Sequence, residues 1–162
     1  MSPLRGTRVV VLNWRDLGHG LGGGAERYAW EMARALVADG AQVTFVCGRD
    51  AGQDRRDRIE GIDVRRRGGA VTWLVWAALH LLRHRRRIDA VVDADCGVPA
   101  FSPLFVRRST PVLLVVHHVH QHQFGLYFPR PVAAFGRWVE RTVVPTVYRR
   151  TRTVAVSEST RA

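Results

Sequence analysis

The stretch that decides the fold begins with RVVVLN (residues 8–13), continues through GHGLGGG (residues 18–24), and closes with QVTFVC (residues 42–47). The first and last of these segments are short apolar runs, which are typical of strands buried on both faces of a parallel sheet. Between them, apolar residues recur at i, i+3, i+4 and i+7 from Ala25 to Val37, and Gly40 follows. This spacing predicts an amphipathic helix that ends just before the glycine. Together the segments predict a strand, a glycine loop, a helix and a second strand.

The same alternation continues to the end of the sequence. Further strands are predicted at residues 62–65, 88–93, 111–116 and 153–157, helices at 71–84 and 131–143, and a loop or short helix at 98–106. Pro145 is expected to kink or end the last helix. The pattern predicts an α/β fold, a Rossmann-like three-layer domain with a mostly parallel sheet of about six strands. In such sheets ligands bind at the carboxyl ends of the strands, so the residues that follow each strand are the candidates for function.

The composition of the chain narrows the classes of protein to which it can belong. The chain has 162 residues and a formal charge of +11, and all 25 basic residues are arginine. With two cysteines, Cys47 and Cys96, neither a disulfide framework nor a zinc ribbon is predicted. The longest apolar run, residues 70–82, is too short to span a bilayer, and the first residues do not resemble a signal peptide. We therefore expect a cytoplasmic protein.

The arginines form short clusters at residues 55–58, 65–67, 83–87 and 149–152. A solvated surface, contact with anionic lipid or a polyanionic substrate, and nucleic-acid binding are the three interpretations. Aromatic residues are not interleaved with these clusters as a single-strand stacking groove requires. The helix predicted at 71–84 carries tryptophans and leucines and ends in arginines, so contact with a bilayer interface is considered beside an ordinary core helix.

The glycine loop matches G-x-G-x-x-G at residues 18–23. Glycines between a strand and a helix let backbone N–H groups approach a phosphate. Two features disfavour a dinucleotide site: the match begins five residues after Asn13, and the first acid after the second strand, Asp50, comes late. Glu26 in the first helical turn would also compete with a bound anion. The alternative is a glycine turn that only packs the helix on the sheet.

Four histidines lie in HHVHQH (residues 117–122), directly after the fifth predicted strand. Alternation at His118, His120 and His122 would allow a zinc site in an extended segment, but no carboxylate or thiol accompanies it. Loop histidines without a chemical role are a second interpretation. The third is that one imidazole orients a hydroxyl or stabilises developing charge at the crevice.

Four landmarks combine into a family resemblance: residues 8–13, GGGAERY (22–28) with DGAQVT (39–44), residues 111–117, and TVAVSEST (153–160). In this order they resemble the N-terminal domain of retaining glycosyltransferases of the GT-B fold, the group described as glycosyltransferase subfamily 4-like. The resemblance covers essentially the whole chain. It implies that residues 1–162 form one half of a GT-B fold, the acceptor-side Rossmann-like domain, incomplete at its C-terminal end.

The resemblance also implies an activity and a site. Family members transfer a sugar from a nucleotide-diphosphate sugar to an acceptor with retention of configuration, usually without a metal, and we expect no cofactor. Gly22, Gly23 and Gly24 would face the cleft near the acceptor and the donor phosphates. His117 would lie beside the transferred sugar, favoured over His118 because it follows the strand immediately. Ser157 would lie at the cleft rim.

Family enzymes carry a second domain that holds the nucleotide, so the chain alone is expected to be inactive. The acceptor is expected to be a lipid-linked molecule or a glycan. The domain is a candidate for peripheral contact with the inner face of the membrane. No nucleic-acid partner is expected. Two other functions stay open. One is an NAD(P)-binding Rossmann module of an oxidoreductase, and the other is a basic membrane- or nucleic-acid-binding module without catalysis.

Overall fold

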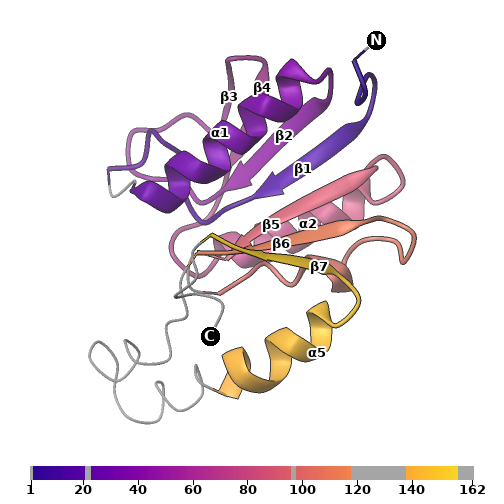
Figure 1. Cartoon of the computed structure of the whole chain (residues 1–162). Helices are drawn as coiled ribbons and strands as arrows, with labels where there is room; N and C mark the ends of the chain where they lie inside the picture. Colours follow the sequence, from indigo (N-terminus) through magenta and orange to yellow (C-terminus); the bar gives the residue numbers. More distant parts are fainter. Residues whose placement is uncertain (1, 21–22, 96–97, 118–137, 157–162) are drawn as a thin grey trace.

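The computed structural model describes residues 2–20, 23–95, 98–117 and 138–156 (Figure 1). Within them the chain forms a seven-stranded sheet of order β3-β4-β2-β1-β5-β6-β7. The strands are β1 (Arg8–Leu12), β2 (Gln42–Cys47), β3 (Arg56–Ile59), β4 (Ile62–Arg66), β5 (Ala90–Asp95), β6 (Val112–Val116) and β7 (Arg152–Ala155). The α-helices are α1 (Gly24–Ala38), α2 (Trp73–His84) and α5 (Val144–Tyr148).

Every neighbouring pair of strands is parallel except β3 and β4. The six parallel strands therefore follow the order third, second, first, fourth, fifth, sixth, which is the doubly wound arrangement of Rossmann folds. The predicted α/β class with a mostly parallel sheet is confirmed.

Two apolar cores sandwich the sheet and make three layers. On one face, Ala29, Trp30 and Ala33 of α1 pack against a cluster that includes Phe45 of β2. On the other face, α2 contributes three buried side chains and α5 contributes the buried Tyr148. Figure 1 shows α1 and α2 on opposite sides of the sheet. Because β1 is covered on both faces, its apolar run does not alternate with polar residues.

The helix after the glycine loop has the predicted length. Its N-cap is Gly23, its last residue is Ala38, and Gly40 follows with φ +89°, a left-handed conformation that favours glycine. The backbone N–H of Gly40 donates to the carbonyl of Val37 at 2.9 Å. The glycine therefore ends α1 and turns the chain into β2.

The hairpin of β3 with β4 adds a strand where the sequence predicts a polar loop. Ile59 pairs with Ile62, and the two residues between them, Glu60 and Gly61, have φ values of +52° and +83°. Positive φ at both positions is the geometry of a type I′ turn, which joins antiparallel strands tightly. The strand sequence, Arg-Asp-Arg-Ile, carries no apolar alternation because β3 is an edge strand with mostly exposed side chains.

Of the two outcomes predicted for Pro145, a kink or an end, the structure excludes the end, because α5 continues to Tyr148. A π-helical turn, Val139–Val143, precedes α5. Proline lacks an N–H and its ring crowds the preceding turn, and a widened turn accommodates both effects. Residues 131–137, where the helix is predicted to begin, lie outside the described residues. The loop predicted at 98–106 is confirmed and contains a 3-10 turn, Ser102–Leu104.

Candidate functional site

The carboxyl edge of the sheet brings the predicted site segments together. The crossover direction reverses between β1 and β5, and Rossmann folds bind ligands outside this switch point. The loop after β1 carries the glycines, and His117 follows β6, which is the neighbour of β5. The two predicted groups therefore lie on either side of the switch point.

The glycine loop is described on both sides of residues 21–22, so Gly22 lies outside the described residues. The backbone N–H of Gly23 donates to Glu26 Oε2 at 2.8 Å, and that of Gly20 donates to Asp50 Oδ2 at 3.2 Å. Backbone N–H donors from Gly20 and Ala51 hold the pKa of the Asp50 carboxyl below its ordinary value. Two of the chain's own carboxylates thus bind amides that a dinucleotide pyrophosphate would need.

At Gly24 the backbone is more open. A Cβ atom built there meets no described atom within 4 Å, whereas one at Gly20 would stand 3.3 Å from Asp50 Oδ2. The start of α1 therefore presents free space at Gly24, while the first part of the loop is closed by its own hydrogen bonds.

A buried ion pair fixes the base of the loop. Arg66 Nε at the end of β4 donates to Asp16 Oδ2 at 2.5 Å, and the two side chains are 5% and 2% exposed. Gln53 Nε2 donates to the other oxygen of Asp16 at 2.9 Å. A charge pair with such low exposure needs both partners, because either charge alone would be buried without compensation. No pattern in the sequence predicts this pair, although Asp16 and Arg66 each lie close to the end of a strand.

His117 is 3% exposed and directly follows β6. Its backbone N–H donates to the carbonyl of Asp95 at 3.2 Å. Its imidazole meets the ring of Tyr28 in α1 edge to face, with centroids 5.2 Å apart and an interplanar angle of 81°. The helix that starts at the glycine loop and the histidine predicted for the active site are therefore in direct contact.

The other predicted residues are placed only in part. His118, the histidine segment up to residue 122, and Ser157 lie outside the described residues. Val156, which precedes Ser157, donates its backbone N–H to the carbonyl of Val116 at 3.2 Å. The end of β7 thus lies beside the end of β6. Among the described residues, no three or more His, Cys, Asp or Glu side chains gather as metal ligands would.

A second network of buried hydrogen bonds, which no pattern in the sequence predicts, holds the segments next to this edge of the sheet. The carboxyl oxygens of Asp93 in β5 accept from the backbone N–H groups of Ala100 at 3.0 Å and Ser102 at 3.1 Å, and from Tyr148 Oη at 2.5 Å. Burial, together with the Asp93 carboxyl, raises the pKa of the Tyr148 phenol. Asp93 fixes the loop after β5 and docks α5.

The fold and this edge of the sheet are those of a Rossmann-type α/β domain in which the helix after the glycine loop contacts the buried His117 through Tyr28. The model of glycosyltransferase family 4 matches residues 22–162, and the chain belongs to that family. Family membership confirms the resemblance seen in the sequence.

Comparison with solved structures finds an alpha-glucosyltransferase in complex with UDP and a 13-mer DNA containing an HMU base. The two sequences are 10% identical and the TM-score is 0.48, over 93% of this chain and 42% of that one. The present chain thus spans less than half the length of that enzyme. No curated protein matches the chain. In the described part of the chain, no helix is long and apolar enough to cross a membrane.

Proposed function

We propose that this chain is the acceptor-side domain of a retaining glycosyltransferase of the GT-B type, which transfers a sugar from a nucleotide-diphosphate sugar to an acceptor. The observation that carries the proposal is the contact between Tyr28 of the glycine-loop helix and His117. This contact puts the loop and the imidazole at one edge of the sheet, where a donor and an acceptor would meet.

In this proposal each residue has a separate role. The loop at Gly22, Gly23 and Gly24 has no side chains, so the acceptor and the donor phosphates can approach its backbone closely. His117 hydrogen-bonds the transferred sugar and stabilises charge that develops at the reacting centre, and Ser157 lines the rim. A preorganised hydrogen-bond donor to developing charge contributes roughly 10²–10³-fold to a rate. The nucleotide would be held by a second domain, so the chain alone is expected to be inactive, and a lipid-linked molecule or a glycan would be the acceptor.

The first test is binding and turnover of nucleotide sugars. The 162-residue chain is titrated with UDP- and GDP-sugars, and amide NMR signals of Gly23, Gly24 and His117 are followed. Shifts confined to these residues support the proposal, and shifts confined to residues away from this edge of the sheet contradict the donor-facing role. Transfer or hydrolysis by the chain alone would refute the expected inactivity.

A variant pair tests the histidine. His117→Gln is expected to abolish the donor-induced shifts, while Thr110→Ala, at the opposite end of β6, leaves them unchanged. Titration with NADPH separates the oxidoreductase alternative: saturable NADPH binding would contradict the glycosyltransferase proposal. The amides of Gly20 and Gly23 already donate to Asp50 and Glu26, which disfavours that alternative.

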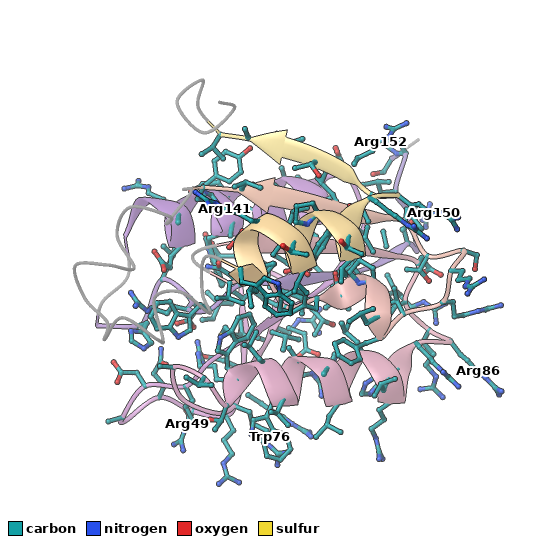
Figure 2. The ribbon with its side chains drawn as sticks, turned by 90° about the horizontal axis from the view of Figure 1, so that it is seen from below. Arg49, Trp76, Arg86, Arg141, Arg150 and Arg152 are labelled. Atoms are coloured by element: carbon teal, nitrogen blue, oxygen red, sulfur yellow. The ribbon has the colours of Figure 1, made fainter. Side chains whose placement is uncertain are left out.

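Peripheral contact with anionic lipid is a second proposal, and one observation favours it. Along the outer side of α2 and the turn that precedes it, Val71, Val75 and Leu79 are 75%, 59% and 48% exposed, and the arginines at 85–87 follow the helix. Figure 2 shows Arg86 pointing outward beyond the end of α2. An apolar face flanked by arginine fits an anionic bilayer interface.

Sedimentation with vesicles tests this contact. Binding to vesicles containing phosphatidylglycerol, absent with phosphatidylcholine and weakened in Val75→Ser/Leu79→Ser, is expected. Equal sedimentation of the variant and the unmodified chain would contradict it.

A further inference from the structure

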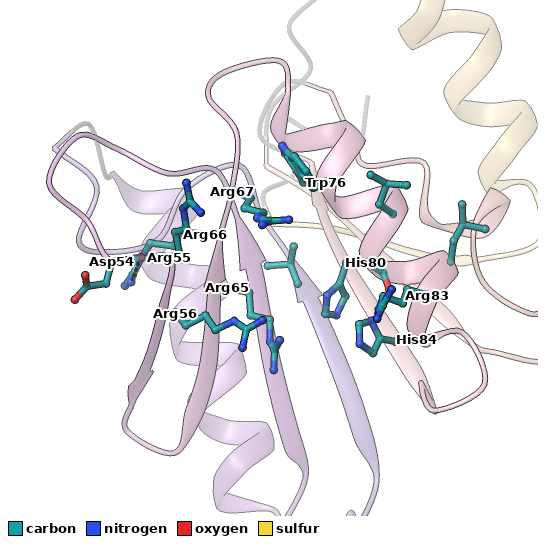
Figure 3. Close-up of a pocket in the computed structure, with 13 residues that line it drawn as sticks. Asp54, Arg55, Arg56, Arg65, Arg66, Arg67, Trp76, His80, Arg83 and His84 are labelled. Carbon is teal, nitrogen blue, oxygen red and sulfur yellow. Dashed lines mark hydrogen bonds between the residues drawn. The ribbon is translucent and has the colours of Figure 1, made fainter.

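A broad groove separates the β3–β4 hairpin from helix α2 (Figure 3). It exists because the connection from β2 to β4 contains strand β3 and no described helix, so no described helix packs over the hairpin on the α2 side. Because side chains along a strand point alternately to the two faces of the sheet, every second residue of β4 points to the groove side. Ile62 and Val64 point into the core under α1, so Asp63 and Arg65 point to the opposite face. The floor includes Val46 of β2, and the volume is about 1340 Å³.

Arginine dominates the lining. Six arginines and a single acid, Asp54, border the groove, the arginines being Arg55, Arg56, Arg65, Arg66, Arg67 and Arg83. Arg66 pairs with Asp16, and Arg65 Nη2 pairs with Asp63 at 2.7 Å. Among the described residues, the remaining four arginines have no carboxylate within 4 Å.

The pairing of β3 with β4 sets two of these like charges opposite each other. Arg56 is the direct cross-strand partner of Arg65. Like charges in this position destabilise a sheet, and only one of the two has a carboxylate beside it. An anion bound between them would remove the repulsion.

The wall across the groove supplies further donors and an aromatic surface. His80 and His84 of α2 stack with centroids 4.4 Å apart, and the Arg67 guanidinium lies 4.3 Å from the ring centroid of Trp76. Burial, with the nearby His84 and Arg65, lowers the pKa of His80 to about 4, so its imidazole is neutral at pH 7. Figure 3 shows Trp76, His80 and Arg83 on the α2 side, facing the hairpin arginines.

We infer that this groove binds a ligand carrying two or more phosphate groups, held between the β3–β4 hairpin and α2. The planar guanidinium fork matches phosphate oxygens, and arginines on both walls can grip successive phosphates. The volume exceeds the roughly 300–1,000 Å³ of ordinary small-ligand pockets, which leaves room for a group attached to the phosphates. Gly23, Gly24 and His117 do not line the groove, so the inference goes beyond the proposed sugar-transfer site.

Isothermal titration of the 162-residue chain with inorganic pyrophosphate tests the inference. Saturable binding is expected, weakened at least tenfold in Arg56→Gln/Arg83→Gln, which removes one unpaired arginine from each wall. The matched control is Arg86→Gln/Arg87→Gln, which removes the same charge just beyond α2 and should change the affinity less than twofold. Equal losses in both double variants would overturn the site, because they would show a general effect of net charge. So would the absence of saturable binding.

A second arm identifies the source of the phosphates. Sedimentation of the chain with vesicles containing phosphatidate is measured with and without pyrophosphate. If pyrophosphate releases the chain from the vesicles, and Arg56→Gln/Arg83→Gln shows no such release, the ligand is a lipid headgroup. If the chain binds pyrophosphate but not the vesicles, the ligand is a free phosphorylated molecule. An oligonucleotide that binds tightly while pyrophosphate does not would overturn the inference and indicate a nucleic-acid surface instead. Near-native NMR spectra of Arg56→Gln/Arg83→Gln would confirm that the lost binding does not come from unfolding. Arg56→Lys/Arg83→Lys keeps the charge without the guanidinium fork and should bind pyrophosphate more tightly than the glutamine variant but more weakly than the unmodified chain.

Discussion

The imidazole of His117 stands edge to face with the ring of Tyr28, with their centroids 5.2 Å apart. Tyr28 belongs to the helix that follows the glycine loop, and His117 follows the strand two positions from β1 in the sheet. The contact joins the two halves of the candidate site across the switch point. It also gives the buried imidazole a wall that restricts its orientation.

Replacing Tyr28 should therefore loosen His117 more than it harms the fold. Tyr28→Leu is expected to lower the free energy of unfolding by about 1 kcal/mol, because an aromatic pair contributes roughly 0.5–1.5 kcal/mol beyond burial. Tyr28→Phe keeps the ring and should cost less than half of this. Urea unfolding measures both, and the His117 ring signals should shift only in the leucine variant. Equal costs would mean that the hydroxyl, and not the ring, makes the contact.

The Asp16–Arg66 pair should behave as a unit. Asp16→Ala leaves Arg66 buried without its main partner and is expected to cost roughly 3–5 kcal/mol of stability. Asp16→Leu/Arg66→Leu should recover at least half of that loss, since the uncompensated charge is gone. Denaturant unfolding of the single and double variants measures this coupling. The exposed pair Arg8–Asp89 offers the control: Asp89→Ala should cost far less.

The Asp93 network predicts a measurable coupling with α5. Tyr148→Phe removes the hydroxyl donor while the N–H groups of Ala100 and Ser102 still donate to Asp93. The expected loss is about 1–2 kcal/mol in thermal or urea unfolding. In Asp93→Ala the same tyrosine substitution should cost much less, because its partner is already absent. Additive losses would contradict the direct hydrogen bond.

His80 predicts a pH dependence with a definite sign. Its pKa is lowered to about 4 from an ordinary 6.5, so between these values the unfolded chain takes up a proton that the folded chain does not. Stability from this residue is constant above pH 6.5 and falls as the pH drops toward 4. The loss is on the order of 2 kcal/mol, since solvent in the groove screens part of the penalty.

Unfolding curves at pH 7.5 and 4.5 test this effect, and the difference between the two should shrink in His80→Gln. Asp50 and Asp89 do not interfere, because their pKa values lie below the ordinary 3.8 and their stabilisation is lost only at lower pH. An NMR midpoint for His80 near 6.5 would contradict the buried placement.

Local patterns in the sequence were sufficient for most of the fold. The apolar run of β1 and the spacing in α1 with Gly40 after it report burial within one turn or one strand. The boundaries of α1, β2 and β6 differ from those predicted by at most two residues. The fourth predicted strand, residues 88–93, is shifted to 90–95, because Asp89 instead binds the backbone N–H and guanidinium of Arg8 before the strand begins.

Strand β3 could not be predicted in this way, and for Pro145 a kink and an end of the helix both stayed open. Arg56 and Arg58 carry no strand signal, and only the backbone bonds to β4 and the turn at Glu60 and Gly61 make them a strand. Edge strands and proline-containing helices are stabilised by partners that are distant in the sequence. Local propensities do not contain this information.

The Rossmann-type order of strands and helices, the glycine loop and the histidine after β6 can all be predicted from the sequence, since each depends on neighbours within a few residues. Which of these residues meet depends on the packing of the whole chain. This packing brought Tyr28 against His117, tied Asp16 to Arg66, and set unpaired arginines such as Arg56 and Arg83 around one groove. Such contacts depend on sheet register and on which face of the sheet each helix covers. Both are settled only when the whole core is packed.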